Sequence, residues 1–555
     1  MSIATPPGDA NEENLSPEQP KQEPANVEKK EKPSDDEREK IFQSFVKKES
    51  SSENKVDESQ QQFQNFAKRF VSEFIKQGGS VGTINFQTGG THIDGSFYNS
   101  SGQFVGGSQY NDSKSNSEGA SDRDPAILDD FDYGAIPLPE RVERWFENYP
   151  AMHHRSLMIA MAFLNGSDCK SIIALSDKLE SKMRSESGKD TQEVDDETLK
   201  FKMLGFKKRL RIVFAYTEDS HENTEFGRNS FEIYLFNDPN FQGALLRYIW
   251  QEEDYYWQII LGCLVELGTT QGSLTKVHLA DALRESCKYR FDLVREMVFI
   301  PWAKTDNPSQ RSLAALSLSM TALGDDENSP QQARNLLSHW STLKNSPNLR
   351  QTSIEAYSLY VGLKFPDDAF EKFQKIIKSN DVSLFSDILE GIVMLFEMSE
   401  SIPDNRLIIL KHLETWLRYD RKESSHEMAA FVTWGIMKTS ETSVDNLTYK
   451  KLPTLFWLAK TDEKISQTVS SLIRSSLNLK LTRSLVIEEL ESWFNFVEKD
   501  SELRQPLGKI ITRIMKHGNS KERLRLKGYL KRWADRGNSY ALTMLTFLQQ
   551  KGLTQ

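Results

Sequence analysis

The pattern Leu-x-x-Trp occurs four times in the C-terminal half of the chain. Successive tryptophans of the pattern lie 76, 77 and 40 residues apart. These spacings are close to one or two multiples of a unit of about 38 to 40 residues, which is the length of a repeat made of two helices. An array of such repeats usually binds other molecules, so the pattern predicts the fold more closely than the activity. The four pairs are Leu337/Trp340, Leu413/Trp416, Leu490/Trp493 and Leu530/Trp533.

Other bulky residues fill the gaps in this series. Trp302 precedes it, the pair Phe370/Phe373 lies in the first gap, and Trp457 lies in the second. Because a single helix pair cannot bury its apolar face alone, we expect residues 251–555 to stack as an α-helical repeat domain of the HEAT or TPR kind. We expect its tryptophans to pack inside the stack and not to contact a ligand.

Composition limits the classes of partner and the compartment. The chain has 555 residues with 70 basic and 80 acidic side chains, a net charge of −10. A protein that binds DNA or an anionic membrane usually has a basic excess, so nucleic acid is not expected as a partner.

The three cysteines, Cys169, Cys263 and Cys287, are not spaced like disulfide partners or zinc ligands. The longest apolar run, 255–265, is about half the length of a membrane span. We expect a cytoplasmic protein without a membrane span.

The N-terminal region is predicted to be disordered. Residues 1–57 form an acidic tail that is too poor in apolar residues to fold, apart from a short helix that starts at Ser34. Residues 58–77 form an amphipathic helix, with aromatic residues three or four positions apart. Two interpretations stay open for these apolar faces, packing on the protein's own body or binding a partner. The aromatic residues are Phe63, Phe66, Phe70 and Phe74.

A low-complexity segment rich in Gly, Asn and Ser follows at residues 78–124. Nine of the 29 glycines lie between Gly78 and Gly107, where Asp94 is the only charged side chain. The segment is a flexible linker, a small stack of β-hairpins, or a self-assembling segment that forms a homo-oligomer through residues 78–110. The candidate residues for self-assembly or partner contact are Ile84, Phe86, Ile93, Phe97 and Phe104.

Residues 137–250 have the element order of a winged helix. A helix at 140–148 precedes two helices, 152–164 and 168–183, which are joined by the turn Asn165-Gly166-Ser167. A further helix near 197–208 then precedes two β-rich runs, 210–216 and 230–236. The sequence therefore predicts a mainly α protein, in which a winged-helix-like module precedes the repeat array.

This module offers one cluster of candidate DNA contacts, which would bind phosphates. However, the helix after the turn carries Asp168, Asp177 and Glu180, and carboxylates disfavour an approach to base edges between phosphate rows. We therefore interpret the module as a packing unit and keep DNA binding as the alternative. The cluster comprises Lys200, Lys202, Lys207, Lys208, Arg209 and Arg211.

A search for catalytic and cofactor motifs finds no candidate. The sequence contains neither the phosphate-binding GxxxxGK[ST] pattern nor Gly-x-Ser-x-Gly. His426-Glu427 begins like a zinc-protease helix, but Ala430 stands where the second histidine is required. His153 and His154 are adjacent, so they point in different directions on a helix. We expect no catalytic, cofactor-binding or metal-binding residues and therefore a non-enzymatic protein without a cofactor.

Four stretches of the sequence resemble a known family. Residues 155–167, 236–250, 264–268 and 301–302 are similar to the region downstream of the P-loop in bacterial signal-transducing ATPases. In that family a nucleotide-binding core is followed by a winged helix and a long helical repeat tail. The resemblance covers residues 137 to 380 and implies this architecture without the ATPase core, because no P-loop precedes the matching region.

Two functional hypotheses follow. The first is a sensor or adaptor in bacterial regulation or defence, in which the array binds a protein partner and the Gly-rich arm recruits or self-assembles. The second is a DNA-binding regulator that uses the winged-helix-like module.

Overall fold

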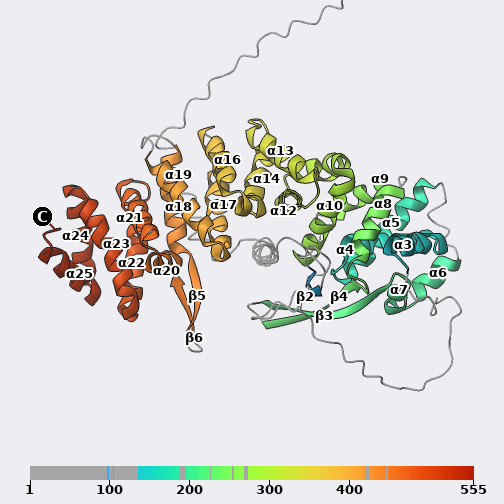
Figure 1. The fold of residues 1–555 in the computed structure, drawn as a ribbon, viewed down its shortest axis with the longest axis horizontal. Helices are drawn as coiled ribbons and strands as arrows, with labels where there is room; N and C mark the ends of the chain where they lie inside the picture. Colours follow the sequence, from blue (N-terminus) through green and yellow to red (C-terminus); the bar gives the residue numbers. More distant parts are fainter. Residues whose placement is uncertain are drawn as a thin grey trace, which may run out of the picture.

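The computed structural model shows a mainly helical chain, as predicted. The elements follow one another along an elongated, curved body (Figure 1). The predicted tail 1–57, the predicted helix 58–77 and most of the segment 78–124 lie outside the described residues. The described residues are 97–98, 104–105, 136–187, 196–224, 227–252, 256–267, 273–379, 381–418, 424–445 and 448–554.

The N-terminal part of the body is a helical unit with one long hairpin. Its central helix, α4, is buried on all sides, since Leu157 to Leu164 are at most 1% exposed. The elements are α3 (Leu138–Asn148), α4 (Met152–Leu164), α5 (Cys169–Glu186), α6 (Asp196–Met203), α7 (Phe206–Ile212), β3 (Ala215–Thr224), β4 (Gly227–Phe236), α8 (Phe241–Glu252) and α9 (Trp257–Leu267).

Two local predictions in this unit are wrong. The single helix expected near 197–208 is two helices, because Gly205 adopts an extended conformation (φ −56°, ψ 142°) and begins α7. The β-rich run expected from Leu210 starts at Ala215 instead, since Leu210 is a buried residue of α7. The order of helices followed by an antiparallel hairpin is as expected, while its assignment as a winged helix stays a prediction.

The helix α10 (Ser273–Val294) joins this unit to the array. It packs on α4 and α8 on one side and on α12 on the other. Arg290 interrupts it with non-helical dihedrals (φ −143°, ψ 52°), and it continues into a π-helix, η2 (Arg295–Phe299), and α11 (Ile300–Lys304).

The rest of the chain is an array of helix pairs. Its first helices begin at residues 308, 347, 385, 424, 463 and 504, so the starts lie 38 to 41 residues apart. The predicted repeat is therefore confirmed. In sequence the pairs are α12 (Pro308–Thr321) with α13 (Ser329–Thr342), α14 (Pro347–Ser358) and α15 (Tyr360–Lys364) with α16 (Pro366–Lys378), α17 (Phe385–Met398) with α18 (Pro403–Leu417), α19 (Ser424–Lys438) with α20 (Thr454–Thr461), α21 (Glu463–Asn478) with α22 (Arg483–Lys499), and α23 (Arg504–His517) with α24 (Ser520–Asp535), followed by α25 (Ser539–Gln550).

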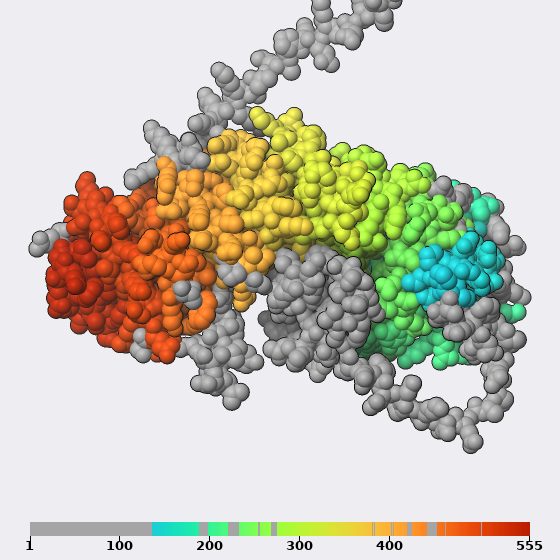
Figure 2. All heavy atoms as spheres, viewed as in Figure 1, coloured from blue at the N-terminus to red at the C-terminus, as the bar shows by residue number. Residues whose placement is uncertain are grey.

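Each first helix packs on the first helix of the next pair, as α12 does on α14 and α21 does on α23. The colours in Figure 2 accordingly change in sequence order along the long axis of the body.

Short 3₁₀ turns precede α17, α18 and α23. Their bounds are η3 (Val382–Leu384), η4 (Ser399–Ser401) and η5 (Ser501–Leu503).

The repeat pattern marks the second helix of each pair. The tryptophans of the four Leu-x-x-Trp motifs, together with Trp302, are at most 2% exposed, so they pack inside the array as predicted. Trp457 differs, because it lies on α20 but is 39% exposed. Its neighbour Phe456 is fully buried and packs on Trp493 with ring centroids 4.4 Å apart. The expectation that Trp457 belongs to the packed series is wrong.

One repeat contains an insertion. A hairpin of β5 (Ser440–Asp445) and β6 (Thr448–Pro453) occupies the connection between α19 and α20 and projects from the array (Figure 1). The amide of Thr454 donates to the carbonyl of Thr439 (3.0 Å), which closes the base of the hairpin. Among the described helices, none is long and apolar enough to cross a membrane.

Candidate functional site

The predicted self-assembly residues lie mostly outside the described residues. Phe97 is on β1 (Phe97–Tyr98) and Phe104 on β2 (Phe104–Val105), two short strands that pair antiparallel. Ile84, Phe86 and Ile93 lie outside the described residues, so self-assembly through this segment stays a prediction.

The predicted DNA contacts lie together on α6 and α7, but several of them are engaged within the protein. Lys202 forms ion pairs with Asp177 (3.7 Å) and Glu180 (3.1 Å). Lys207 lies 3.7 Å from Glu232. The Arg209 guanidinium lies over the rings of Phe201 and Phe206, at 5.8 and 5.0 Å from their centroids. The other three, Lys200, Lys208 and Arg211, are exposed.

The helix after the turn, α5, is covered in part by its neighbours and leaves a stripe exposed at Lys170, Ala174, Asp177 and Ser181. It packs on α4 and on α9, and its Lys178 and Lys182 both form ion pairs with Glu266 of α9. A helix that reads base edges must lie open to the major groove. Glu266 engages two lysines of α5, and the exposed stripe carries the carboxylate of Asp177, which favours the interpretation of this module as a packing unit.

The three cysteine thiols lack the properties of nucleophiles. Burial raises the pKa of Cys263 to about 11 and also raises the pKa of Cys287 and Cys169. Thiols become reactive when their pKa is lowered, so these side chains are packing residues. Within the described part of the chain, no three His, Cys, Asp or Glu side chains lie close enough together to hold a metal ion.

A pocket of about 330 Å³ lies where α10 bends at Arg290. Its wall includes Lys288, Asn328 and Ser329. The side chain of Asp326 already accepts bonds from the amides of Asn328 and Ser329 (3.1 and 2.7 Å), and Lys288 pairs with Glu285 and Asp325. These groups satisfy one another, so the pocket offers little to a charged ligand.

Cationic side chains gather instead near the C-terminal end of the array. The connection from α21 to α22 and the connection from α23 to α24 lie side by side there. We call their cationic side chains the basic ridge: Arg474, Lys480, Arg483, Lys516, Lys521, Arg523 and Arg525.

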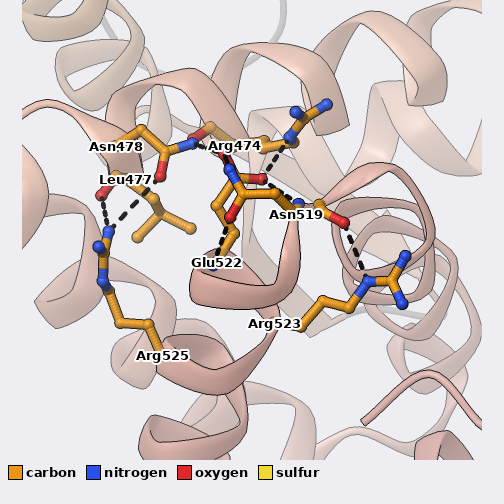
Figure 3. Close-up of polar contacts among 8 residues, drawn as sticks. Arg474, Leu477, Asn478, Asn519, Glu522, Arg523 and Arg525 are labelled. Atoms are coloured by element: carbon orange, nitrogen blue, oxygen red, sulfur yellow. Dashed lines mark hydrogen bonds and ion pairs between the residues drawn. The ribbon is translucent and has the colours of Figure 1, made fainter. Parts of the chain in front are cut away.

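Glu522 on α24 joins the two connections (Figure 3). Its carboxylate accepts from Arg474 Nε (2.9 Å) and from Asn478 Nδ2 (2.7 Å), both on α21. The same carboxylate forms a capping box with Asn519 at the start of α24. Arg525 donates to the carbonyl of Leu477 (3.3 Å). Glu522 is thus fully engaged in holding the ridge together.

The lysines of the ridge are more accessible than its arginines. Lys516 and Lys521 are exposed, and neither forms an ion pair with a carboxylate of the described residues. Arg523 and Arg525 are half-buried and donate to the carbonyls of Gly518 (2.9 Å) and Leu477. The arginines are held in place, while the lysines extend into solvent.

The net charge of the whole chain conceals this ridge, because the acidic N-terminal residues outnumber the basic ones. Residues 504–555 carry 12 basic and 2 acidic side chains, whereas residues 1–503 carry 58 basic and 78 acidic ones. Counting the charged residues segment by segment shows that the net charge changes from negative to positive after residue 503. It does not show that residues 474–483 lie beside residues 516–525.

Comparison with models of known protein families finds no match, and no curated protein is significantly similar to the chain.

Proposed function

We propose that the chain is a non-enzymatic adaptor or sensor whose helical array binds a protein partner. The contact surface is the repeat that contains the inserted hairpin, formed by α19, β5, β6 and α20. The observation that carries this proposal is the exposure of Trp457.

Trp457 is the exception among the repeat-marking tryptophans. The others are at most 2% exposed, while Trp457 is 39% exposed and the ammonium of Lys460 lies 6.0 Å from its ring centroid. Leaving a large aromatic surface in water is costly to folding. Tryptophan is also one of the residues enriched among those that dominate binding energy at protein interfaces.

The inserted hairpin supports the same surface. Among the described residues it is a two-stranded antiparallel sheet, and the outer edge of such a hairpin can pair with an extended segment of a partner. It emerges directly before α20, the helix of Trp457. An aromatic anchor beside a strand edge suits a peptide or loop of another protein.

The remaining parts of the proposed function are supported by the sequence alone. The Gly-rich segment 78–110 recruits or self-assembles, and the protein acts in the cytoplasm, in bacterial regulation or defence. The alternative of a DNA-binding regulator at residues 137–250 has less support, because α9 covers part of α5 and two of the six candidate cations are paired with carboxylates.

Photo-crosslinking tests the contact surface. We would place p-benzoylphenylalanine at position 457 in the full chain and, as a control of similar exposure, at position 547, where Phe547 is 40% exposed. Irradiation in the source cells should yield a crosslinked protein at 457 that is absent at 547. Trp457→Ala should then lower recovery of that protein by about tenfold, as expected for an interface anchor. The same set of proteins at both positions would refute the proposed surface.

A further inference from the structure

The connections between the first and second helices of successive repeats follow one edge of the array, and the charge on that edge changes sign along the chain. The α12–α13 connection contains Asp325, Asp326 and Glu327. The α21–α22 and α23–α24 connections carry the seven cations of the basic ridge around one carboxylate, that of Glu522. The ridge is therefore a local positive strip on an acidic protein.

The internal contacts of the ridge hold its arginines before any ligand binds. Arg474 is fixed by Glu522, and Arg525 is fixed by the carbonyl of Leu477. Arginine presents a planar set of donors that matches phosphate oxygens, and a side chain that is already ordered loses little entropy when it binds. Lys516 and Lys521 add exposed ammonium groups beside them.

We propose that the basic ridge binds the phosphate backbone of nucleic acid without reading its sequence. A strip of seven cations with a single, internally engaged carboxylate has the charge pattern of a backbone-binding surface. This binding activity goes beyond the proposed protein-binding function and does not depend on it, because the two surfaces use different residues.

A linear polyanion fits the ridge better than other anionic partners do. A flat anionic membrane would also face the surrounding surface of a chain whose first 503 residues carry 58 basic and 78 acidic side chains. The chain's own acidic tail is a weak competitor, because its first 60 residues mix 15 acidic with 9 basic side chains. A phosphate backbone carries one charge at every nucleotide and no cations.

Fluorescence anisotropy with the full chain tests the proposal. The probes are a labelled single-stranded DNA and a labelled duplex, each of about 30 nucleotides and mixed sequence, titrated at about 50 and 200 mM salt. We expect a Kd in the micromolar range at low salt for both probes, and a steep loss of affinity with salt, with a slope near −0.9 for each duplex phosphate contacted.

Matched variants assign the binding to the ridge. Lys516→Gln with Lys521→Gln should weaken binding and lower the duplex salt slope by about 2, since each lysine contributes about one phosphate contact. Lys464→Gln with Lys499→Gln removes the same charge from exposed positions at the opposite edge of the neighbouring repeat and should leave the slope unchanged. Lys516→Arg with Lys521→Arg should retain binding.

Three outcomes would overturn the proposal. The first is an absence of binding by the wild-type chain at about 50 µM protein and low salt. The second is an equal loss of slope in the ridge variant and in the opposite-edge variant. The third is binding to phosphatidylserine vesicles with no binding to either DNA probe, which would assign the ridge to a membrane surface. Circular dichroism of each variant verifies the fold, and the Lys→Arg variant separates a loss of charge from a loss of structure.

Discussion

The imidazole ring of His278 on α10 lies directly against Gly166 in the turn between α4 and α5. A Cβ atom at position 166 would lie 2.4 Å from His278 Cε1. The same turn is bound to the hairpin, since Gly166 N donates to the carbonyl of Tyr234 (2.7 Å) and Tyr234 N donates to the carbonyl of Ser167 (3.1 Å). The turn thus joins β4 to the helix that begins the array, and it is a packing junction.

Gly166→Ala should destabilise this junction. The residue has φ +90°, which an L side chain adopts only with strain, and the added methyl group would clash with the imidazole ring of His278. We expect a loss of about 3 kcal/mol in unfolding free energy. Urea denaturation measures it, with Gly243→Ala on α8 as the control, because that position has open space and a helical backbone and should become slightly more stable. A loss of similar size at both positions would contradict the packing explanation.

Acidification should weaken the protein through His278. Burial lowers its pKa from 6.5 to about 4, although Asp281 opposes the shift. The unfolded chain therefore binds the proton more readily, so the stabilising contribution is complete above pH 6.5 and is lost as the pH falls from there toward 4. Melting temperatures between pH 7.5 and 4.5 should show a smaller acid-induced decrease in His278→Gln than in the wild type. Parallel curves for the two proteins would contradict the assignment.

Phe456→Ala should destabilise the fold far more than Trp457→Ala does, although the two residues are adjacent. Phe456 is fully buried against Trp493, so its truncation should cost about 3 to 5 kcal/mol. Trp457 is exposed, and its truncation should change stability by less than about 1 kcal/mol. Thermal unfolding compares the two variants. A large destabilisation by Trp457→Ala would show that the ring supports the fold and would weaken its proposed role as an interface anchor.

Glu522 and Asn519 should act as one unit at the start of α24. Asn519→Ala removes the cap and should cost about 1 kcal/mol. Glu522→Ala should cost more, because Arg474 and Asn478 also lose their acceptor. Since the two residues bond to each other, the double variant should cost less than the sum of the single variants. Hydrogen exchange of the first turn of α24 measures the effect, and strict additivity would contradict the coupling.

The spacing of bulky residues predicted the repeat array correctly because burial in stacked helices requires that spacing wherever the array continues. It failed at Trp457, where two adjacent aromatic residues, Phe456 and Trp457, could each have filled the core position. Spacing cannot choose between neighbours on one helix, and the inserted hairpin before α20 adds residues to the repeat that simple counting does not allow for.

The candidate site could be predicted only in part. The cations after Arg504 are visible as a run in the sequence, and a count by segment finds them. Their conversion into a ridge depends on Glu522 reaching Arg474, 48 residues earlier, across a contact between two repeats. Conversely, Lys202 and Lys207 looked available in the sequence, but folding brings Glu180 and Glu232 to them.

The sequence alone determined the helices of this protein and the length of their repeat. Helix periodicity, the length of the repeat and the buried positions of the Leu-x-x-Trp motifs can be read from residues a few positions apart, because the helix imposes a constant geometry on them. Which charges are neutralised and which remain exposed depends on residues 22 to 48 positions apart, as for Lys202 with Glu180 and Arg474 with Glu522. Packing between helices brings such residues together, and no local pattern in the sequence specifies the pairing.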